Sequence, residues 1–442
     1  MGNILGNLTT YIIPTVIVLG LMILVHEWGH FVVARAFGVR VDVFSIGFGP
    51  RLWGRKRGDT DWRISALPLG GYVKMAGDNP AEERAGAPDE FLSKPRWQRA
   101  IIAMAGPFMN ILTTVLIFYG LFVAVGEGHF RYYDQPAEIA AVARKSAAEN
   151  SGIRAGDRIV DINGVPVGTW GDAIKRMSVL LPQNDLSVKF ERDGSNFMVD
   201  VKSKAPLDLG DALGYPRDPV IIGELSPGMP AAASGMREGD EIVAINGTPI
   251  LSWPQCVNAI RNSQGQMLEF DLRRGGEPLQ ISVKPVLARS GSAWQVGMTP
   301  RLDLVYTRLG PVEAVSVSIE RTRDYGVLIV GIVGQLLTGK VALREMSSII
   351  GISREAGQAA KRGPAELIGF MAAISLNLGI LNLLPIPILD GGHVFMLAIE
   401  GIRRRDLSLA VKERFVQVGM VFLLVVFAIV MYNDVLKLLP HR

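Results

Sequence analysis

Apolar residues along the chain gather in four stretches, each long enough to cross a bilayer at about 20 residues per span. We assign these spans to residues 1–37, 100–126, 365–402 and 403–442, the last including the C-terminus. A long polar segment separates the second span from the third. The pattern therefore predicts a membrane protein with four transmembrane α-helices and a large water-exposed insert.

The connections between the spans have patterns of their own. Residues 38–99 are rich in glycine and include a loosely alternating run, Trp62–Leu67, which is typical of β-structure. In the connecting segment 310–364, the apolar run Val327–Leu337 is too short to span and has basic residues on both sides. We expect this run to form an amphipathic helix that lies on a membrane or protein surface.

The composition indicates a mixed molecule with a sizeable polar part. The 442 residues include 46 basic and 42 acidic side chains. Charged residues make up 20% of the chain, against roughly 25% in soluble domains. These values exclude a disordered chain, a collagen-like chain and a purely soluble enzyme. The single cysteine, Cys256, excludes a disulfide framework, and a net charge of +4 without runs of like charge predicts no nucleic-acid partner.

Basic residues are distributed unevenly among the connections. Residues 38–99 carry eleven Lys and Arg, residues 403–414 carry five, and none precedes the first span. Short loops rich in Lys and Arg stay in the cytoplasm. We therefore expect both termini and the long insert on the outer side, with residues 38–99 on the cytoplasmic side or re-entering the membrane from it.

The insert repeats itself. Residues 151–167 and 234–250 share eleven of seventeen positions, including the pattern Gly-Asp-x-Ile-Val-x-Ile-Asn-Gly. A repeat of about 80 residues is domain-sized, and the pattern resembles that of PDZ domains. We assign the two copies to residues 127–220 and 221–309. PDZ domains capture a peptide by strand addition, although two such domains could also act only as spacers.

The first span contains His26-Glu27-Trp28-Gly29-His30. Residues i and i+4 share one helix face, so both imidazoles can reach one metal ion, and Glu27 can act as a general base beside it. Ionisable groups within a span are costly and are functional by default. The motif therefore predicts a zinc site with His26 and His30 as metal ligands and Glu27 as the catalytic base.

A catalytic zinc site needs a third protein ligand. Pro385 and Pro387 must interrupt the third span, and Asp390 follows them as the only carboxylate between Leu381 and His393. His26 lies 14 residues before Arg40 and Asp390 lies 13 before Arg403, which gives both a similar depth in the cytoplasmic half of the bilayer. Asp390 is the predicted third ligand. His393 is an alternative ligand, and Asp390 could instead cap a helix.

The first-span motif, the sequence from Asn382 to Gly391 and the intervening PDZ-like insert together resemble the site-2 protease family of intramembrane zinc metalloproteases. Further segments share the likeness over essentially the whole chain, namely 44–50, 67–75 and 105–110. The chain departs from the family pattern at 347–352, where a glycine and a proline are missing.

The resemblance implies a set of site residues. It makes His26, His30 and Asp390 zinc ligands, Glu27 the catalytic base, and Asn377 and Asn382 substrate contacts. It also implies a β-hairpin sheet that dips into the membrane beside the metal and binds an unwound substrate along its edge. To the substrate-binding set we add residues from the shared segments, namely Gly70, Gly71, Tyr72 and Asn110. The alternatives are an ordinary cytoplasmic hairpin, and asparagines that bond backbone freed by the prolines.

The leading functional hypothesis is a zinc endopeptidase in the bacterial inner membrane that cleaves transmembrane segments. The resemblance implies single-span substrates, such as an anti-sigma factor shortened by a first cut in envelope stress signalling, or remnant signal peptides. A membrane scaffold that binds misfolded proteins through the PDZ pair is one alternative, but it would not need Glu27. A metal transporter is another, but the outer halves of the spans lack the ionisable residues that it requires.

Overall fold

The computed structural model describes residues 8–79, 86–142, 146–180, 186–201, 213–288, 293–301, 304–338 and 348–438. The chain forms two compact units. The first, which we call the membrane unit, comprises the residues up to Glu127 and those from Thr307 to Leu439. The second, the β unit, comprises Gly128–Tyr306.

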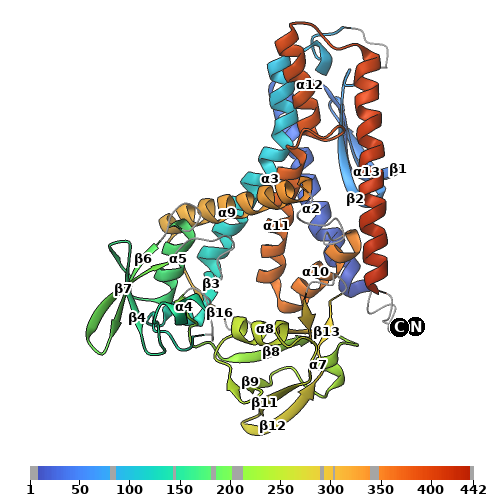
Figure 1. The fold of residues 1–442 in the computed structure, drawn as a ribbon. Helices are drawn as coiled ribbons and strands as arrows, with labels where there is room; N and C mark the ends of the chain where they lie inside the picture. The colour runs from blue at the N-terminus through green and yellow to red at the C-terminus, as the bar shows by residue number, and fades with distance from the viewer. Residues whose placement is uncertain are drawn as a thin grey trace. The chain divides into compact units, whose positions relative to one another are not determined.

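The membrane unit is built mainly from helices (Figure 1). Its helices are η1 (Leu8–Ile12), α2 (Ile13–Ala36), η2 (Phe91–Ser93), α3 (Arg96–Ala124), α9 (Pro311–Leu337), α10 (Ile349–Arg362), α11 (Pro364–Asn382), α12 (Asp390–Arg403) and α13 (Leu409–Leu438). Four segments of the described chain are long and apolar enough to cross a membrane: Thr9–Ala36, Arg96–Ala124, Pro364–Asn382 and Leu409–Tyr432. This agrees with the four spans that the sequence predicts.

Helix α3 lies between α2 and α11, and small residues bring the three backbones together. Gly29 on α2 faces the backbone of Ala105, where an added Cβ would overlap the carbonyl. Gly379 on α11 meets Pro107 of α3 in the same way, with 3.0 Å between an added Cβ and the carbonyl oxygen. Close approach through small residues is typical of membrane helices, since lipid gives no hydrophobic driving force between them.

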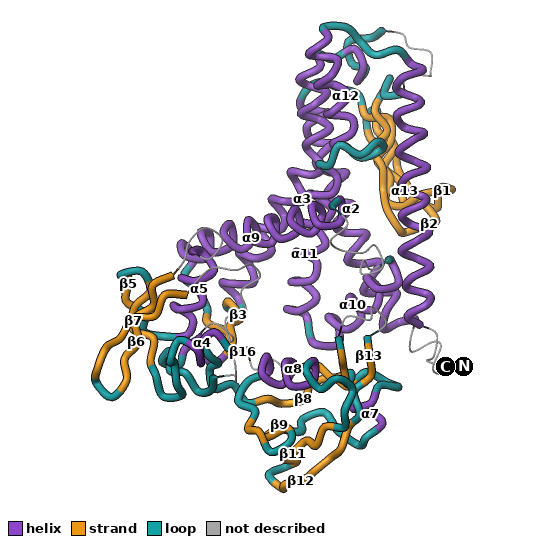
Figure 2. The backbone as a smooth tube through the Cα atoms, viewed as in Figure 1, coloured by secondary structure: helices purple, strands orange, loops and turns teal. Residues whose placement is uncertain are grey.

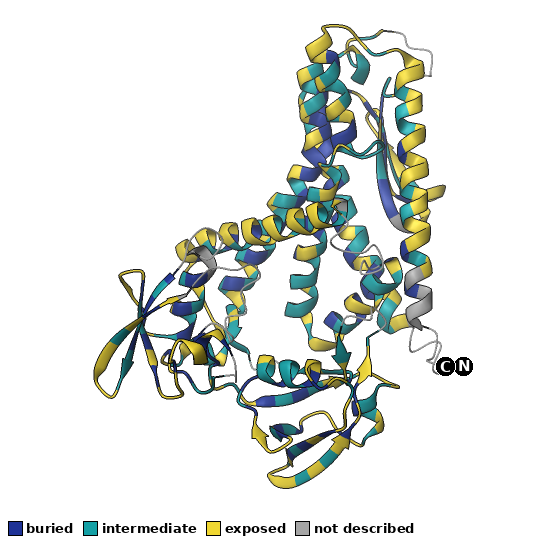
Figure 3. Ribbon diagram, in the orientation of Figure 1, coloured by how far each residue is buried: buried dark blue, intermediate teal, exposed yellow. Residues whose placement is uncertain are grey.

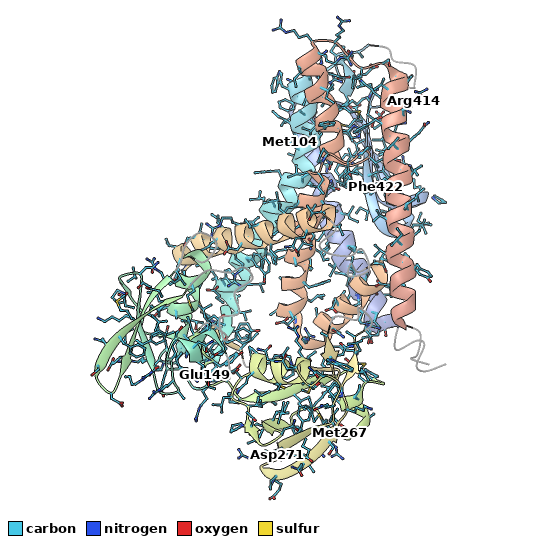
Figure 4. The ribbon with its side chains drawn as sticks, in the orientation of Figure 1. Met104, Glu149, Met267, Asp271, Arg414 and Phe422 are labelled. Atoms are coloured by element: carbon cyan, nitrogen blue, oxygen red, sulfur yellow. The ribbon has the colours of Figure 1, made fainter. Side chains whose placement is uncertain are left out.

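Helix α13 is far less covered (Figure 3), with large apolar side chains exposed along much of its length. Met104 on α3 and Phe422 on α13, both labelled in Figure 4, are exposed apolar side chains of this unit. Two polar contacts fix the ends of α13. The Lys412 Nζ lies 2.8 Å from the buried Glu400, and Asp434 accepts hydrogen bonds from the backbone and hydroxyl of Ser348 at the start of α10.

The third apolar stretch is broken between α11 and α12. The break contains Pro385 and Pro387, which cannot donate a helical hydrogen bond, and Ile388 has a positive φ of 82°. Gly391 and Gly392 then pack against backbone carbonyls of the break itself. The break therefore starts a new helix, α12, with Asp390 at its first residue.

Two long strands, β1 (Val41–Arg57) and β2 (Thr60–Met75), follow α2 and form a separate sheet (Figure 2). Their register shows several irregularities, because each strand folds back on itself. Residues 41–46 pair on one side with 71–75 and on the other with 61–64, while 51–57 pair with 60–65 as a hairpin. Residues 70–75 therefore form one edge of the sheet.

Helix α9 is longer than the sequence analysis predicts. The apolar run Val327–Leu337 is only its second half, and the helix begins at Pro311. Proline is favoured in the first turn of a helix, and Glu313 in that turn suits the positive end of the helix dipole. The polar residues between this first turn and Val327 continue the helix on its exposed side. The apolar run alone could not show where the helix begins. The departure from the family pattern at 347–352 begins outside the described residues, and Ser348 caps α10.

The β unit contains the two copies of the repeat, each with its own apolar core. Its helices are η3 (Arg131–Asp134), α4 (Ala147–Asn150), α5 (Trp170–Leu180), α7 (Pro230–Ala233) and α8 (Trp253–Arg261). Its strands are β3 (Glu127–Phe130), β4 (Arg158–Ile162), β5 (Val165–Pro166), β6 (Leu186–Arg192), β7 (Ser195–Val201), β8 (Val220–Leu225), β9 (Glu241–Ile245), β10 (Thr248–Pro249), β11 (Leu268–Arg274), β12 (Glu277–Val283), β13 (Val286–Leu287), β14 (Trp294–Gln295), β15 (Met298–Pro300) and β16 (Leu304–Thr307); β3 and β16 each reach one residue into the membrane unit.

The two copies repeat a buried ion pair as well as a sequence pattern. Asp157 accepts two hydrogen bonds from Arg192 in the first copy, and Asp240 accepts two from Arg274 in the second. Both aspartate side chains are 1% exposed. Each pair ties the loop before a strand to the end of another strand, so the repeat preserves the closure of each core.

Candidate metal centre

His26 and His30 lie one turn apart on α2, and both are buried. Their Nε2 atoms are 3.2 Å apart. The helix produces this arrangement by itself, since residues four apart stand above one another on one face. The two nitrogens therefore face a common point, as ligands of one metal ion must.

Asp390 reaches the same point from a segment 360 residues further along the chain. Its Oδ2 lies 3.0 Å from the Nε2 of His26, and its Oδ1 lies 3.5 Å from the Nε2 of His30. The three ligand atoms all lie within 4.8 Å of one another, and the group contains no other residue of the described chain. His393, the alternative ligand, lines the neighbouring cavity but is outside this group.

The surroundings of the two imidazoles fit a metal ion bound through Nε2. The Nδ1 of His30 lies 2.8 Å from the carbonyl oxygen of Ile102 and can donate to it, which leaves the Nε2 lone pair free. Gly106 faces both imidazoles, and a Cβ there would overlap both Nε2 atoms. Two imidazoles and one carboxylate are a ligand set that catalytic zinc uses in proteins. The residues present therefore fit zinc.

Glu27 follows the first ligand and borders a cavity of about 950 Å³ that also contacts His26, His30 and Asp390. Its side chain lies against the edge segment of the sheet. An added Cβ at Gly71 would be 3.5 Å from the Cγ of Glu27, and the carboxylate interacts with the backbone of Val73. A carboxylate beside the ligands, bordering a cavity, can act as a general base for a water molecule there.

The remaining predicted site residues are placed differently from one another. Gly70, Gly71 and Tyr72 line the cavity, as does Asn382, whose Nδ2 lies 3.3 Å from the Nε2 of His26. Asn377 is half-buried on α11 and is not among the residues that line the cavity. The role of all five residues in substrate binding stays a prediction.

Asn110 is fully buried behind the ligands and does not line the cavity either.

Two features of the centre were missed by sequence reasoning. The carbonyl of Ile102 is a backbone atom, so no residue type could reveal it. Gly106 lies in a segment that carries the family likeness, but nothing in the sequence assigns it to the histidines. The cavity also extends to a polar end at Arg99, Glu400 and Lys412, which no motif indicated.

Comparison with known proteins identifies the family of the chain. The model of peptidase family M50 matches residues 14–426. The chain belongs to peptidase family M50. It is 34% identical over 468 residues to Protease RseP of Yersinia pestis, covering 99% of this chain and 100% of that protein. It is 33% identical over 470 residues to the regulator of sigma-E protease RseP of Escherichia coli (strain K12), with the same coverage.

The names of other relatives include zinc. A protein of Neisseria meningitidis serogroup A, named for a zinc metalloprotease, is 30% identical over 439 residues, which cover 95% of this chain and 97% of that protein. Among solved structures, the PDZ domain of an SdrC-like protein from Listeria innocua covers 21% of this chain at 18% identity. Its TM-score is 0.18.

The family and the relatives establish the activity class. The M50 chain described here is a zinc metalloprotease of the inner membrane, as the sequence predicts.

Proposed function

We propose that this M50 protease cleaves peptide bonds within or next to the transmembrane segments of single-span proteins. One observation carries the proposal. The three ligand atoms of His26, His30 and Asp390 converge between helices that are apolar enough to span a membrane, with Glu27 beside them. This position supports a scissile bond that belongs to a substrate within the bilayer.

The residues of the centre divide the chemistry between them. His26, His30 and Asp390 would hold zinc, which when bound supplies a Lewis acid for the peptide carbonyl. Glu27 takes the proton of the attacking water and delivers it to the leaving nitrogen.

A substrate that arrives as a helix must unwind before cleavage, and its freed backbone groups then need partners. The edge segment 70–75 borders Glu27 and offers such partners by strand addition. Phe48 and Tyr72 stack 8° from parallel beside this edge, so the segment is held by ring packing. Asn382, close to His26, also lines the cavity and can donate a hydrogen bond to a substrate carbonyl.

The two copies of the repeat in the β unit act as PDZ domains on the outer side and admit only shortened substrates. The relatives named as regulators of sigma-E support an anti-sigma factor that a first protease has trimmed. The filter needs volume rather than a peptide groove, and remnant signal peptides satisfy it as well.

The test of the activity compares the full chain with Glu27→Gln on a panel of single-span substrates in detergent or vesicles. Cleavage should fall by about 10²–10⁴-fold, since general-base catalysis contributes that much. Bound zinc should be unchanged, because Glu27 is not a ligand. Turnover in Glu27→Gln close to that of the full chain would refute the assignment.

The filter is tested by presenting one substrate span with and without a folded outer domain. The full chain should cleave only the short form, and a chain lacking residues 128–306 should cleave both. If changes along a PDZ groove alone abolish cleavage of the short form, the domains capture a terminus instead.

Orientation is tested with single cysteines and a membrane-impermeant thiol reagent in intact cells. The native Cys256 is buried and does not compete for the reagent. A cysteine replacing the partly exposed Asp271, labelled in Figure 4, should react from outside, whereas cysteines replacing Lys56 or Arg404 should not. The reverse pattern would place the centre in the outer half of the bilayer.

A further inference from the structure

The side chain of Asn110, next to the metal centre, has an incomplete set of hydrogen bonds. Asn110 is 0% exposed, and its Nδ2 lies 3.2 Å from the Nδ1 of His26. Its Oδ1 is buried and has no hydrogen-bond partner in the described part of the chain. Buried amide oxygens are nearly always bonded, so this arrangement calls for an explanation.

The chemistry of the histidine supplies one. The Nε2 of His26 faces His30 and Asp390, so it is the atom that would bind the metal and must keep its lone pair. A neutral imidazole then carries its proton on Nδ1 and needs an acceptor there. An amide nitrogen cannot accept a hydrogen bond, but the oxygen of the same amide can after a half-turn of the amide group.

Helix α3 already does this for the other ligand. The carbonyl oxygen of Ile102 lies 2.8 Å from the Nδ1 of His30. Ile102, Gly106 and Asn110 follow one another at a spacing of four, so they lie on one face of α3. That face contacts His30 through Ile102, both histidines through Gly106, and His26 through Asn110.

We infer that Asn110 positions His26 for metal binding by accepting a hydrogen bond from its Nδ1–H through Oδ1. Asn110 is then a positioning residue, and the substrate contact that the sequence analysis assigns to it is replaced. The inference rests on the proposed metal centre, because it needs His26 to be a ligand. Acceptors behind metal-bound histidines typically change metal affinity by about 10–100-fold.

The test measures Zn²⁺ affinity of the full-length purified protein by competition with a chelator. Asn110→Leu has a similar shape but no acceptor, and it should bind Zn²⁺ about 10–100-fold more weakly. Asn110→Asp keeps an acceptor and loses the donor, so it should bind Zn²⁺ at least as tightly as the native chain. The zinc-free Asn110→Leu protein should keep its helix content by circular dichroism.

Thr114→Val is the matched control. Thr114 lies one turn further on α3, is fully buried, and donates to the carbonyls of Asn110 and Ala372 rather than to a ligand. Loss of the Thr114 hydroxyl in Thr114→Val should leave the Zn²⁺ affinity unchanged. Native Zn²⁺ affinity in Asn110→Leu would overturn the inference. An Asn110→Asp protein that binds Zn²⁺ about 10–100-fold more weakly than the native chain would also overturn it. The aspartate variant still gives a result if the leucine variant does not fold.

His26→Ala separates this inference from the metal centre itself. If His26→Ala loses Zn²⁺ while Asn110→Leu keeps it, only the role of Asn110 is wrong. If His26→Ala keeps Zn²⁺, the proposed centre is wrong.

Discussion

The repeat of the β unit and the metal centre of the membrane unit compensate their buried polar groups in different ways. In the β unit, each buried aspartate of the repeat is matched by an arginine of the same copy, Asp157 by Arg192 and Asp240 by Arg274. In the membrane unit, His26, His30 and Asp390 come from two distant helices and converge on one another. Buried charge has to be compensated in both cases. Compensation within one copy stabilises a fold, whereas convergence between helices prepares a site for a ligand.

The largest expected effect comes from removing one of the metal ligands that the membrane unit brings together. His26→Ala and Asp390→Ala should each reduce bound zinc and proteolysis to background, because two remaining ligands do not make a catalytic zinc site. Zinc content by elemental analysis and cleavage of a single-span substrate measure the two effects. His393→Ala is the control and should retain zinc. If His393→Ala loses the metal and Asp390→Ala keeps it, the third ligand is His393.

The two imidazoles need the space that Gly106 leaves beside them, and a substitution at Gly106 tests this requirement. A methyl group there would overlap the Nε2 atoms of both histidines, so Gly106→Ala should weaken zinc binding and destabilise the helix packing by about 1–3 kcal/mol. Gly120→Ala is the matched control on the same helix, since an added Cβ meets nothing within 4 Å. Thermal unfolding and zinc titration compare the two variants. Equal behaviour would show that the face of α3 does not shape the centre.

The β unit should respond to loss of an ion pair in stability alone. Asp240→Asn weakens the two hydrogen bonds from Arg274, and the second copy should unfold more readily while zinc content stays native. Cys256 reports this, because its thiol is fully buried and burial raises its pKa to about 12, so thiol reagents reach it only on unfolding. Glu241→Gln, which affects an exposed pair with Arg273, is the control. A loss of zinc in Asp240→Asn would contradict the division between the units.

The smallest expected effect is a pH dependence of the same copy. The hydrogen bonds from Arg274 hold the pKa of Asp240 below its usual value, so the unfolded chain binds the proton more readily. The stabilisation is therefore complete above the ordinary carboxyl pKa of about 4 and is lost as the pH falls below it. Cys256 exposure during urea unfolding at pH 6 and pH 3 should show the difference, and Asp240→Asn should show less of it.

Much of the architecture follows from local patterns. The four spans, the proline break before Asp390 and the two copies of the repeat each depend on residues close together in the sequence. The Asn-Gly turns of the repeat are an example, since Asn163 and Asn246 both have a φ of 50° beside a glycine. The start of α9 at Pro311 was missed, because an apolar run shows only the part of a helix that is apolar throughout.

The sequence by itself determined the pair His26 and His30 with Glu27 between them, because one helical turn brings positions i and i+4 together wherever the helix lies. The sequence favours Asp390 over His393, and the structure groups Asp390 with the two imidazoles. Only the tertiary structure placed the carbonyl of Ile102 behind His30 and gave Gly106 and Asn110 their places beside the imidazoles. These relations join α2, α3 and α12 across many residues of chain. They depend on how closely helices pack, and a sequence pattern with a period of four cannot specify the neighbour on the other side.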